Sequence, residues 1–270
     1  MRPPTRDEIE TFQRDGAVCL RGMIAPSDLA VLRDGIDANL VHPSRRAKIA
    51  NGPDDPGRFI EDFRCWQENV FYRQFIFESG IGEAAARLMR SETARLYHDH
   101  MLTKEANTRQ KTPWHQDQPY YNVEGMQNCS FWIPVDRVER EATLEFIAGS
   151  HKGPWLMPRS FMDSQAKWFP EGSLKDLPDI ESARSDFPIV GWELEPGDLV
   201  CFHMLALHAS AGTTNRRRVF SVRFLGDDIV HAPRSWATSP DFSDMQADVP
   251  RGAPMHHTLF PVVWPRAAQP

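Results

Sequence analysis

Residues 196–224 read PGDLVCFHMLALHASAGTTNRRRVFSVRF, two apolar runs separated by turn residues. The first run follows a Pro-Gly turn, the second ends at Phe224, and both have the length and the β-branched and aromatic content of strands. Similar short runs recur from residue 95 onward: ARLYHDHMLTK, CSFWIPVDRV, ATLEFIAG and VGWELE. Short strands bounded by turn residues at this spacing predict an antiparallel barrel or sandwich.

The first ninety residues have a different pattern. Residues 5–16, 27–40 and 82–91 have the caps and periodicity of helices, while AVCLRGMI (17–24) reads as a strand and 42–57 as a polar loop. No linker separates this region from the strands that follow. We therefore expect one domain over residues 1–270, mainly β with flanking helices, in which residues 1–92 support a β core at about 95–230.

A long insertion interrupts the expected core at about residues 152–188. Its aromatic side chains include Trp155, Phe161, Trp168 and Phe169. Long ordered loops in compact domains often form lids or the walls of binding sites, although some are only irregular connections.

Composition restricts the class of protein. Hydrophobic residues make up 41% of the 270 residues and charged residues 25%, as in ordinary globular proteins. The net charge of −6 gives no reason to expect a nucleic acid or an anionic membrane as partner. The four cysteines are far apart, the start has no apolar signal segment, and no run approaches the ~20 apolar residues of a membrane span. We therefore expect a cytoplasmic protein.

A second stretch, TPWHQDQPYY at residues 112–121, carries candidate metal ligands. In a strand, residues two apart project to the same face, so His115 and Asp117 would point together. Imidazole plus carboxylate suits iron(II), with zinc or manganese also possible. Two ligands do not make a site, because H-x-D triplets are common. A third ligand should come from another strand, and His203 and His208 are the candidates.

These pieces together resemble the phytanoyl-CoA dioxygenase family. The shared features are the H-x-D triplet, the later PGD turn leading to a distal histidine, and an arginine about ten residues after it. The resemblance runs from FQRDGAVCLRGMI (12–24) to about residue 228. Members are iron(II)- and 2-oxoglutarate-dependent oxygenases with a double-stranded β-helix core, the jelly-roll or cupin-like fold. The resemblance implies that His115, Asp117 and His208 bind the metal, whereas His203 is structural.

The resemblance also implies a cosubstrate pocket. The far carboxylate of 2-oxoglutarate needs a fixed cation, and the spacing from the distal histidine favours Arg217. Arg218 would require a shift of one residue, while Arg223 lies on the same strand face as Arg217 but late, so both stay alternatives. Four further residues match the family's pocket less firmly: Trp132, Ser210, Thr112 and His100. Trp132 could equally be a core aromatic, and His100 a structural histidine.

The predicted function is hydroxylation of an unactivated C–H bond of a small-molecule metabolite, with O2 consumed and succinate and CO2 released. Because Asp117 is kept where halogenating relatives have a small residue, the resemblance implies oxygen transfer. Two alternatives remain on the same barrel: a metal-dependent hydrolase, and a ligand-binding protein without catalysis. Tyr120, Tyr121 and the insertion could wall the substrate pocket, and no basic patch favours an acyl-CoA.

Overall fold

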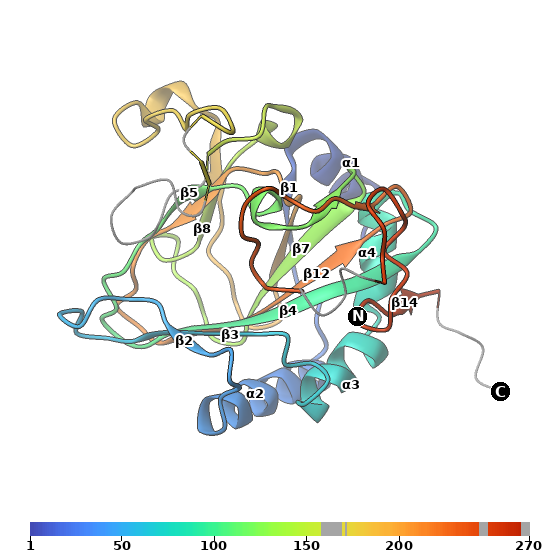
Figure 1. The fold of residues 1–270 in the computed structure, drawn as a ribbon. Helices are drawn as coiled ribbons and strands as arrows, with labels where there is room; N and C mark the ends of the chain where they lie inside the picture. Colours follow the sequence, from blue (N-terminus) through green and yellow to red (C-terminus); the bar gives the residue numbers. More distant parts are fainter. Residues whose placement is uncertain (158–168, 171, 243–247, 266–270) are drawn as a thin grey trace.

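Two antiparallel sheets form the centre of the protein in the computed structural model (Figure 1), which describes residues 1–157, 169–170, 172–242 and 248–265. The larger sheet has the strand order β1-β10-β7-β12-β4-β3-β2, with β14 paired to β4. Its strands are β1 (Ala17–Leu20), β2 (Lys48–Ile49), β3 (Phe59–Phe63), β4 (Ala94–Lys104), β7 (Asn128–Pro134), β10 (Leu199–Phe202), β12 (Arg217–Leu225) and β14 (Val262–Trp264).

The smaller sheet has the order β5-β11-β8-β9 and faces the larger one. Its strands are β5 (Thr112–His115), β8 (Leu144–Ile147), β9 (Ile189–Gly191) and β11 (His208–Ser210). A separate pair joins β6 (Val123–Glu124) to β13 (Val230–His231). Three short 3-10 turns complete the connections: η1 (Gln118–Tyr120), η2 (Ser150–Lys152) and η3 (Arg184–Asp186). The predicted mainly β, jelly-roll architecture with flanking helices is confirmed.

Four helices cover the outer face of the larger sheet. They are α1 (Arg6–Asp15), α2 (Pro26–Val41), α3 (Val70–Glu78) and α4 (Ile81–Met89). Figure 1 shows α2, α3 and α4 on the side of this sheet that faces away from β5 and β8. The helices and the outward side chains of the sheet form the main hydrophobic core. None of the helices among the described residues has the length and apolarity to span a membrane.

Strand β12 shows how this layering positions the site. Phe220, Val222 and Phe224 are fully buried in the core on the helix side. Arg217 and Arg223 belong to the alternate set, which faces the smaller sheet and lines a cavity. Alternation along one strand therefore places aromatic side chains in the core and cationic side chains in the interior of the jelly roll.

The entry into the first strand is fixed by a helix end. Thr5 and Glu8 form the expected capping box at the start of α1, and Gly16 ends the helix with φ of 76°. A Cβ atom at Gly16 would lie 2.3 Å from Nδ1 of His151. Glycine is therefore required here both by the backbone conformation and by the close packing of the imidazole.

The sheets extend beyond the core predicted at 95–230. Strands β1 and β3 from the N-terminal region, and β14 near the C-terminus, all pair within the larger sheet. The predicted polar loop at 42–57 contains the two-residue strand β2, and the aromatic-rich helix α3 was not predicted. Neither segment shows a clear hydrophobic period of 2 or 3.6 residues, because β2 is too short and the aromatic residues of α3 are spread along the whole helix. Within the insertion, Phe161 and Trp168 lie outside the described residues.

Candidate active site

The eight residues singled out from the sequence all line one cavity between the two sheets. Its volume is about 450 Å³. Its lining includes His100, Thr112, His115, Asp117, Trp132, His208, Ser210 and Arg217. The structure therefore brings together side chains that span more than a hundred positions of the sequence.

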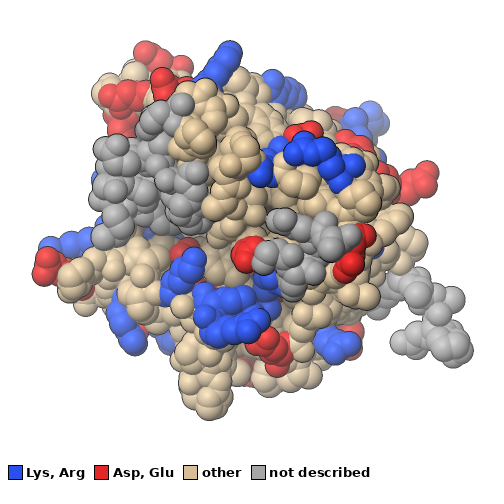
Figure 2. Space-filling view, viewed as in Figure 1, with Lys and Arg blue, Asp and Glu red and all other residues tan. Residues whose placement is uncertain are grey.

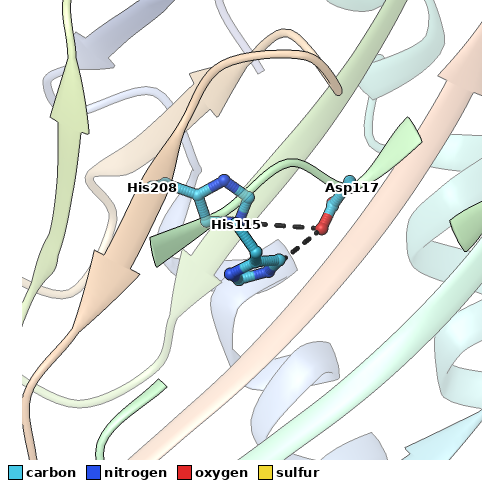
Figure 3. A group of neighbouring side chains, drawn as sticks. All are labelled: His115, Asp117 and His208. Atoms are coloured by element: carbon cyan, nitrogen blue, oxygen red, sulfur yellow. Dashed lines mark ion pairs between the residues drawn. The ribbon is translucent and has the colours of Figure 1, made fainter. Parts of the chain in front are cut away.

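Three of them converge at one point (Figure 3). Nε2 of His115 lies 3.5 Å from Oδ1 of Asp117, and Nε2 of His208 lies 3.6 Å from the same oxygen. His208 on β11 is the direct ladder partner of His115 on β5, which places their ring centroids 4.2 Å apart. Ligand atoms about 2.1 Å from one metal ion lie roughly 3 Å from each other, so these three atoms need only small adjustments to hold an ion.

Hydrogen bonds fix both imidazoles in the orientation a metal requires. Nδ1 of His115 donates to the carbonyl oxygen of Pro113, and Nδ1 of His208 donates to that of Ala206, each at 2.8 Å. Because a carbonyl oxygen can only accept, each ring must carry its proton on Nδ1 and direct the Nε2 lone pair toward the cluster. Burial and the neighbouring His115 lower the pKa of His208 to about 3, which keeps this ring neutral.

Asp117 supplies the negative charge of the cluster. Burial opposes its ionisation, but the guanidinium of Arg223 and the two histidines outweigh this and hold the pKa of the carboxyl well below its ordinary value. The carboxylate therefore stays ionised through the neutral pH range. An N2O donor set of two imidazoles and one carboxylate on one side of an ion is typical of non-haem iron(II) sites.

His115 and Asp117 do not lie on one strand, although their spacing of two residues predicted this. Strand β5 ends at His115, and Asp117 has helical φ and ψ of −75° and −43° immediately before η1. The two side chains converge because the chain turns there, not because both lie on one strand face. The backbone N–H groups of Asp117 and Gln118 both donate to the carbonyl oxygen of Met204, which fixes the turn against the segment that leads to His208.

The three arginines that could bind the far carboxylate have different surroundings. Arg218 points outward and forms ion pairs with Asp136 and Asp37. Arg223 is paired with Asp117, 3.3 Å away. Arg217 has no carboxylate partner among the described residues, and it is 95% buried. Among the three, Arg217 is therefore the guanidinium available to an incoming anion.

Arg217 contacts one aromatic ring and one backbone carbonyl. Its guanidinium lies over the Trp132 ring, 5.3 Å from the centroid, and its Nη1 donates to the carbonyl oxygen of Ala142. Its Nε has no hydrogen-bond partner although it is buried. Ser210 and Thr112, which are ladder partners on β11 and β5, line the same cavity. Burial lowers the pKa of Arg217 to about 10, so the group is still a cation at neutral pH.

Lys104 is a second buried cation-forming group near Arg217, its ladder partner across β4 and β12. Its Nζ donates to the carbonyl oxygens of Gln110 and Ala211 at 2.7 and 2.9 Å. Burial, and then the charge of Arg217, lowers the pKa of Lys104 to about 6. The amine is therefore mostly neutral above pH 6 in the folded protein but protonated up to about pH 10 in the unfolded chain.

This difference predicts a pH-dependent stability. Between about pH 6 and 10 the unfolded chain binds one more proton than the folded protein at Lys104, so the free energy of unfolding should rise with pH by up to about 1.4 kcal/mol per unit. Lys104→Met should remove this rise and stabilise the protein at pH 7. Urea unfolding at pH 7, 8 and 9 measures it, with the exposed Lys111→Met as control. An unchanged slope in Lys104→Met would contradict the assignment.

His100 lines the cavity at a distance from Arg217 along the sheet. It is the ladder partner of Ser221 on β12, four residues beyond Arg217. Its ring stacks on Phe63 with centroids 3.8 Å apart, and its Nε2 lies 3.3 Å from Oε1 of Glu61. Its neighbours thus lie on β3, which is separated from β12 by β4 in the same sheet.

Several lining residues were not found from the sequence. Phe59, Glu61 and Phe63 face the cavity from β3, and Lys48, Asn51 and Ser239 join them from loops and short strands. The alternation in FIEDF was a usable signal for β3. No such sequence pattern indicates Ser239. This residue follows the predicted core and reaches the cavity because of the path of the C-terminal segment.

A family model described as phytanoyl-CoA dioxygenase (PhyH) matches residues 12–219, a range that contains the three clustered residues and Arg217. The chain belongs to the phytanoyl-CoA dioxygenase family. A Caenorhabditis elegans relative named a probable phytanoyl-CoA dioxygenase is 27% identical over 234 residues, which cover 82% of this chain and 69% of the relative.

Two solved structures show that this family member shares its fold with enzymes that its sequence resembles only distantly. One is the non-haem α-ketoglutarate-dependent carbocyclase SnoK from nogalamycin biosynthesis, with a TM-score of 0.75, 19% identity and coverage of 97% of this chain and 99% of that one. The other is the epimerase SnoN in complex with Fe3+, α-ketoglutarate and nogalamycin RO, with a TM-score of 0.74, 20% identity and coverage of 95% and 97%. The predicted family and fold are confirmed.

Proposed function

We propose that this protein is an iron(II)- and 2-oxoglutarate-dependent oxygenase that hydroxylates a C–H bond of a small molecule. The observation that carries the proposal is the convergence of His115, Asp117 and His208 in a cavity that also holds a buried arginine without an acidic partner. Membership of the phytanoyl-CoA dioxygenase family supports it, because the family supplies this chemistry with these residue types.

The residues fit both groups that the activity needs. Iron(II) would be held by Nε2 of His115, Nε2 of His208 and Oδ1 of Asp117, an N2O set that leaves about three of six positions open. When bound, iron(II) and 2-oxoglutarate supply the oxidation, in which O2 is consumed, 2-oxoglutarate is converted to succinate and CO2, and one oxygen atom is placed on the substrate carbon. The protein supplies ligand geometry, orientation and a water-excluding cavity.

Arg217 would bind the far carboxylate of 2-oxoglutarate. A planar guanidinium can donate to both carboxylate oxygens, and in a buried cavity this interaction is little screened by water. The buried, unpartnered Nε of Arg217 is the group in this structure that such an anion would satisfy. Ser210 and Thr112 offer hydroxyl donors beside it, and Trp132 provides an apolar wall that holds the guanidinium plane.

The substrate would occupy the other half of the cavity, so His100 is better assigned to the substrate than to the cosubstrate. Here the wall combines the stacked His100–Phe63 pair and Glu61 with the phenol rings of Tyr120 and Tyr121. Such a wall suits a partly apolar molecule with one or two polar groups. SnoN, which shares the fold, is described with nogalamycin RO, a small-molecule ligand.

The charges of the site do not favour an acyl-CoA as substrate. Three basic residues are found among the described residues that line the cavity: Lys48, Arg217 and Arg223. Arg223 is paired with Asp117, and Arg217 is assigned to the cosubstrate, which leaves Lys48 for a phosphate-rich ligand. On the face seen in Figure 2, basic and acidic side chains are interspersed rather than segregated.

We also propose that residues 1–270 form one domain and that the protein is cytoplasmic. A single domain over residues 1–270 is supported by β1 and β14, which come from near the two ends of the chain and pair into the same sheet. A reducing, cytoplasmic location is supported by the four cysteines, all of which are free.

Coupling between O2 consumption and succinate formation distinguishes the oxygenase from the hydrolase and from the binding protein. The protein reconstituted anaerobically with iron(II) and 2-oxoglutarate should form succinate slowly when O2 is added, and a matching metabolite from a screened set should accelerate this with one O2 consumed per succinate. A zinc-loaded sample is the control and should be inactive. A hydrolase would instead cleave ester or amide probes with zinc and without O2. A binding-only barrel would bind the metabolite without iron and form no succinate.

A further inference from the structure

Arg223 lines the same cavity, six residues beyond Arg217 on the same face of β12. The structure gives this guanidinium two side-chain partners. Its Nη2 lies 3.3 Å from Oδ2 of Asp117, and its Nε donates to the phenol oxygen of Tyr121 at 3.1 Å. Arg223 and Asp117 are each 94% buried. The contact between them is therefore shielded from water and from salt, unlike an ion pair on the surface.

The two oxygens of Asp117 have different neighbours. Oδ1 faces Nε2 of His115 and Nε2 of His208, at 3.5 and 3.6 Å. Oδ2 faces Nη2 of Arg223, with the hydroxyl of Ser130 at 3.5 Å. One oxygen is thus directed toward the metal position, and the other is held by donors on the larger sheet.

We propose that Arg223 is a positioning residue that restricts Asp117 to binding the metal through Oδ1 alone and thereby keeps a coordination position open. This inference rests on the proposed function. A carboxylate with both oxygens free can chelate an ion and occupy two positions. With two histidines, single-oxygen binding leaves three of six positions, enough for the two donor oxygens of 2-oxoglutarate and for O2. Two-oxygen binding would leave only two.

The turn that carries Asp117 explains why such a device is needed. Because β5 ends at His115, no ladder on a neighbouring strand fixes the direction of the Asp117 side chain. Arg223 contacts Asp117 just before η1 and Tyr121 just after it, so it joins both ends of this turn to β12. Arg223 therefore connects the larger sheet to the turn that follows β5 of the smaller sheet, and it does so next to the metal position.

A purely structural ion pair would predict a different behaviour. If Arg223 only neutralised a buried carboxylate, its loss would lower stability without changing how the folded protein binds metal or 2-oxoglutarate. If it positions Asp117, its loss should free Oδ2 to bind the metal as well, which changes the coordination number and therefore the visible spectrum of a bound cobalt ion. Because only two positions then remain, 2-oxoglutarate can still chelate the metal, but no position is left for O2.

The test uses the full chain in anaerobic titrations with cobalt(II), which reports its coordination by visible absorption. Arg223→Met keeps the length and apolar stem but has no donor. Arg223→Lys restores one donor, and Arg218→Met on the outer face of the same strand is the matched control. We expect an altered cobalt spectrum in Arg223→Met, a spectrum closer to that of the wild type in Arg223→Lys, and the wild-type spectrum in Arg218→Met. Binding of 2-oxoglutarate without metal should be unchanged in all three.

The outcomes separate this inference from the proposed function. If the wild-type protein bound neither cobalt(II) nor 2-oxoglutarate, the proposed function would fail. If it bound both, and cobalt-loaded Arg223→Met had the wild-type spectrum, only the positioning role would be overturned, whatever its activity or thermal stability. Should Arg223→Met not fold, Tyr121→Phe removes the phenol that holds Nε and should change the cobalt spectrum to a smaller extent. A wild-type spectrum in Tyr121→Phe and in Arg223→Lys would then overturn the inference.

Discussion

Replacing Asp117 with alanine should reduce 2-oxoglutarate-dependent succinate formation to the level of a protein-free control. The variant loses the one anionic ligand of the cluster, and two neutral imidazoles alone hold iron(II) weakly. It also leaves Arg223 as a buried cation without its carboxylate, which should destabilise the folded protein by about 3–5 kcal/mol. Succinate release and urea unfolding measure the two effects on the same preparation.

Two companion variants keep these effects apart. Asp117→Asn retains the shape and an acceptor for Arg223 but lacks the charge, so it should fold better than Asp117→Ala and still be inactive. Asp117→Ala combined with Arg223→Met removes both charges and should recover stability without recovering turnover. Full turnover in a folded Asp117→Ala or Asp117→Asn protein would rule out the proposed metal site.

Arg217→Met should raise the Michaelis constant for 2-oxoglutarate by roughly 30- to 4,000-fold. The range corresponds to about 2–5 kcal/mol, the usual loss when one partner of a buried, hydrogen-bonded charge pair is removed. In the absence of 2-oxoglutarate, the same substitution should not destabilise the folded protein. Arg217 is then a buried cation with no acidic partner among the described residues, so methionine should leave the free energy of unfolding unchanged or higher.

The neighbouring arginine gives a matched control for this prediction. Arg218→Met removes a guanidinium from the same strand, but one that is bound to Asp136 and Asp37 outside the cavity. It should keep the wild-type Michaelis constant and the increase in melting temperature that 2-oxoglutarate causes, whereas Arg217→Met should lose that increase. The reverse pattern would show that the anion binds on the other face of β12.

Much of the site could be predicted from the sequence because its residues carry distinct chemical signals. His115, Asp117 and His208 are spaced as in a known family, and the family's spacing from the distal histidine favoured Arg217. The reason given for Asp117 was nevertheless wrong, because a strand was extended two residues too far. Local pattern does not report where a ladder ends when the next residues are fixed by a distant carbonyl, here that of Met204.

The roles of the arginines show a second limit. Arg217 and Arg223 lie on one face of one strand, so alternation cannot separate them. The difference lies in their partners: an acidic residue more than a hundred positions earlier for Arg223, and a tryptophan ring and a backbone carbonyl for Arg217. Similarly, Ser239 lines the cavity because of the path of the C-terminal segment, which no local motif indicates.

The proposed function requires that three side chains and one guanidinium together hold iron(II) and 2-oxoglutarate. An anaerobic titration with iron(II) in the presence of 2-oxoglutarate tests it most directly, through the weak visible charge-transfer band of the chelate. We predict a band that saturates at one iron per chain in the wild-type protein and is absent in a folded His208→Ala variant. A wild-type protein that shows no band, or a band of full strength in His208→Ala, would contradict the claim.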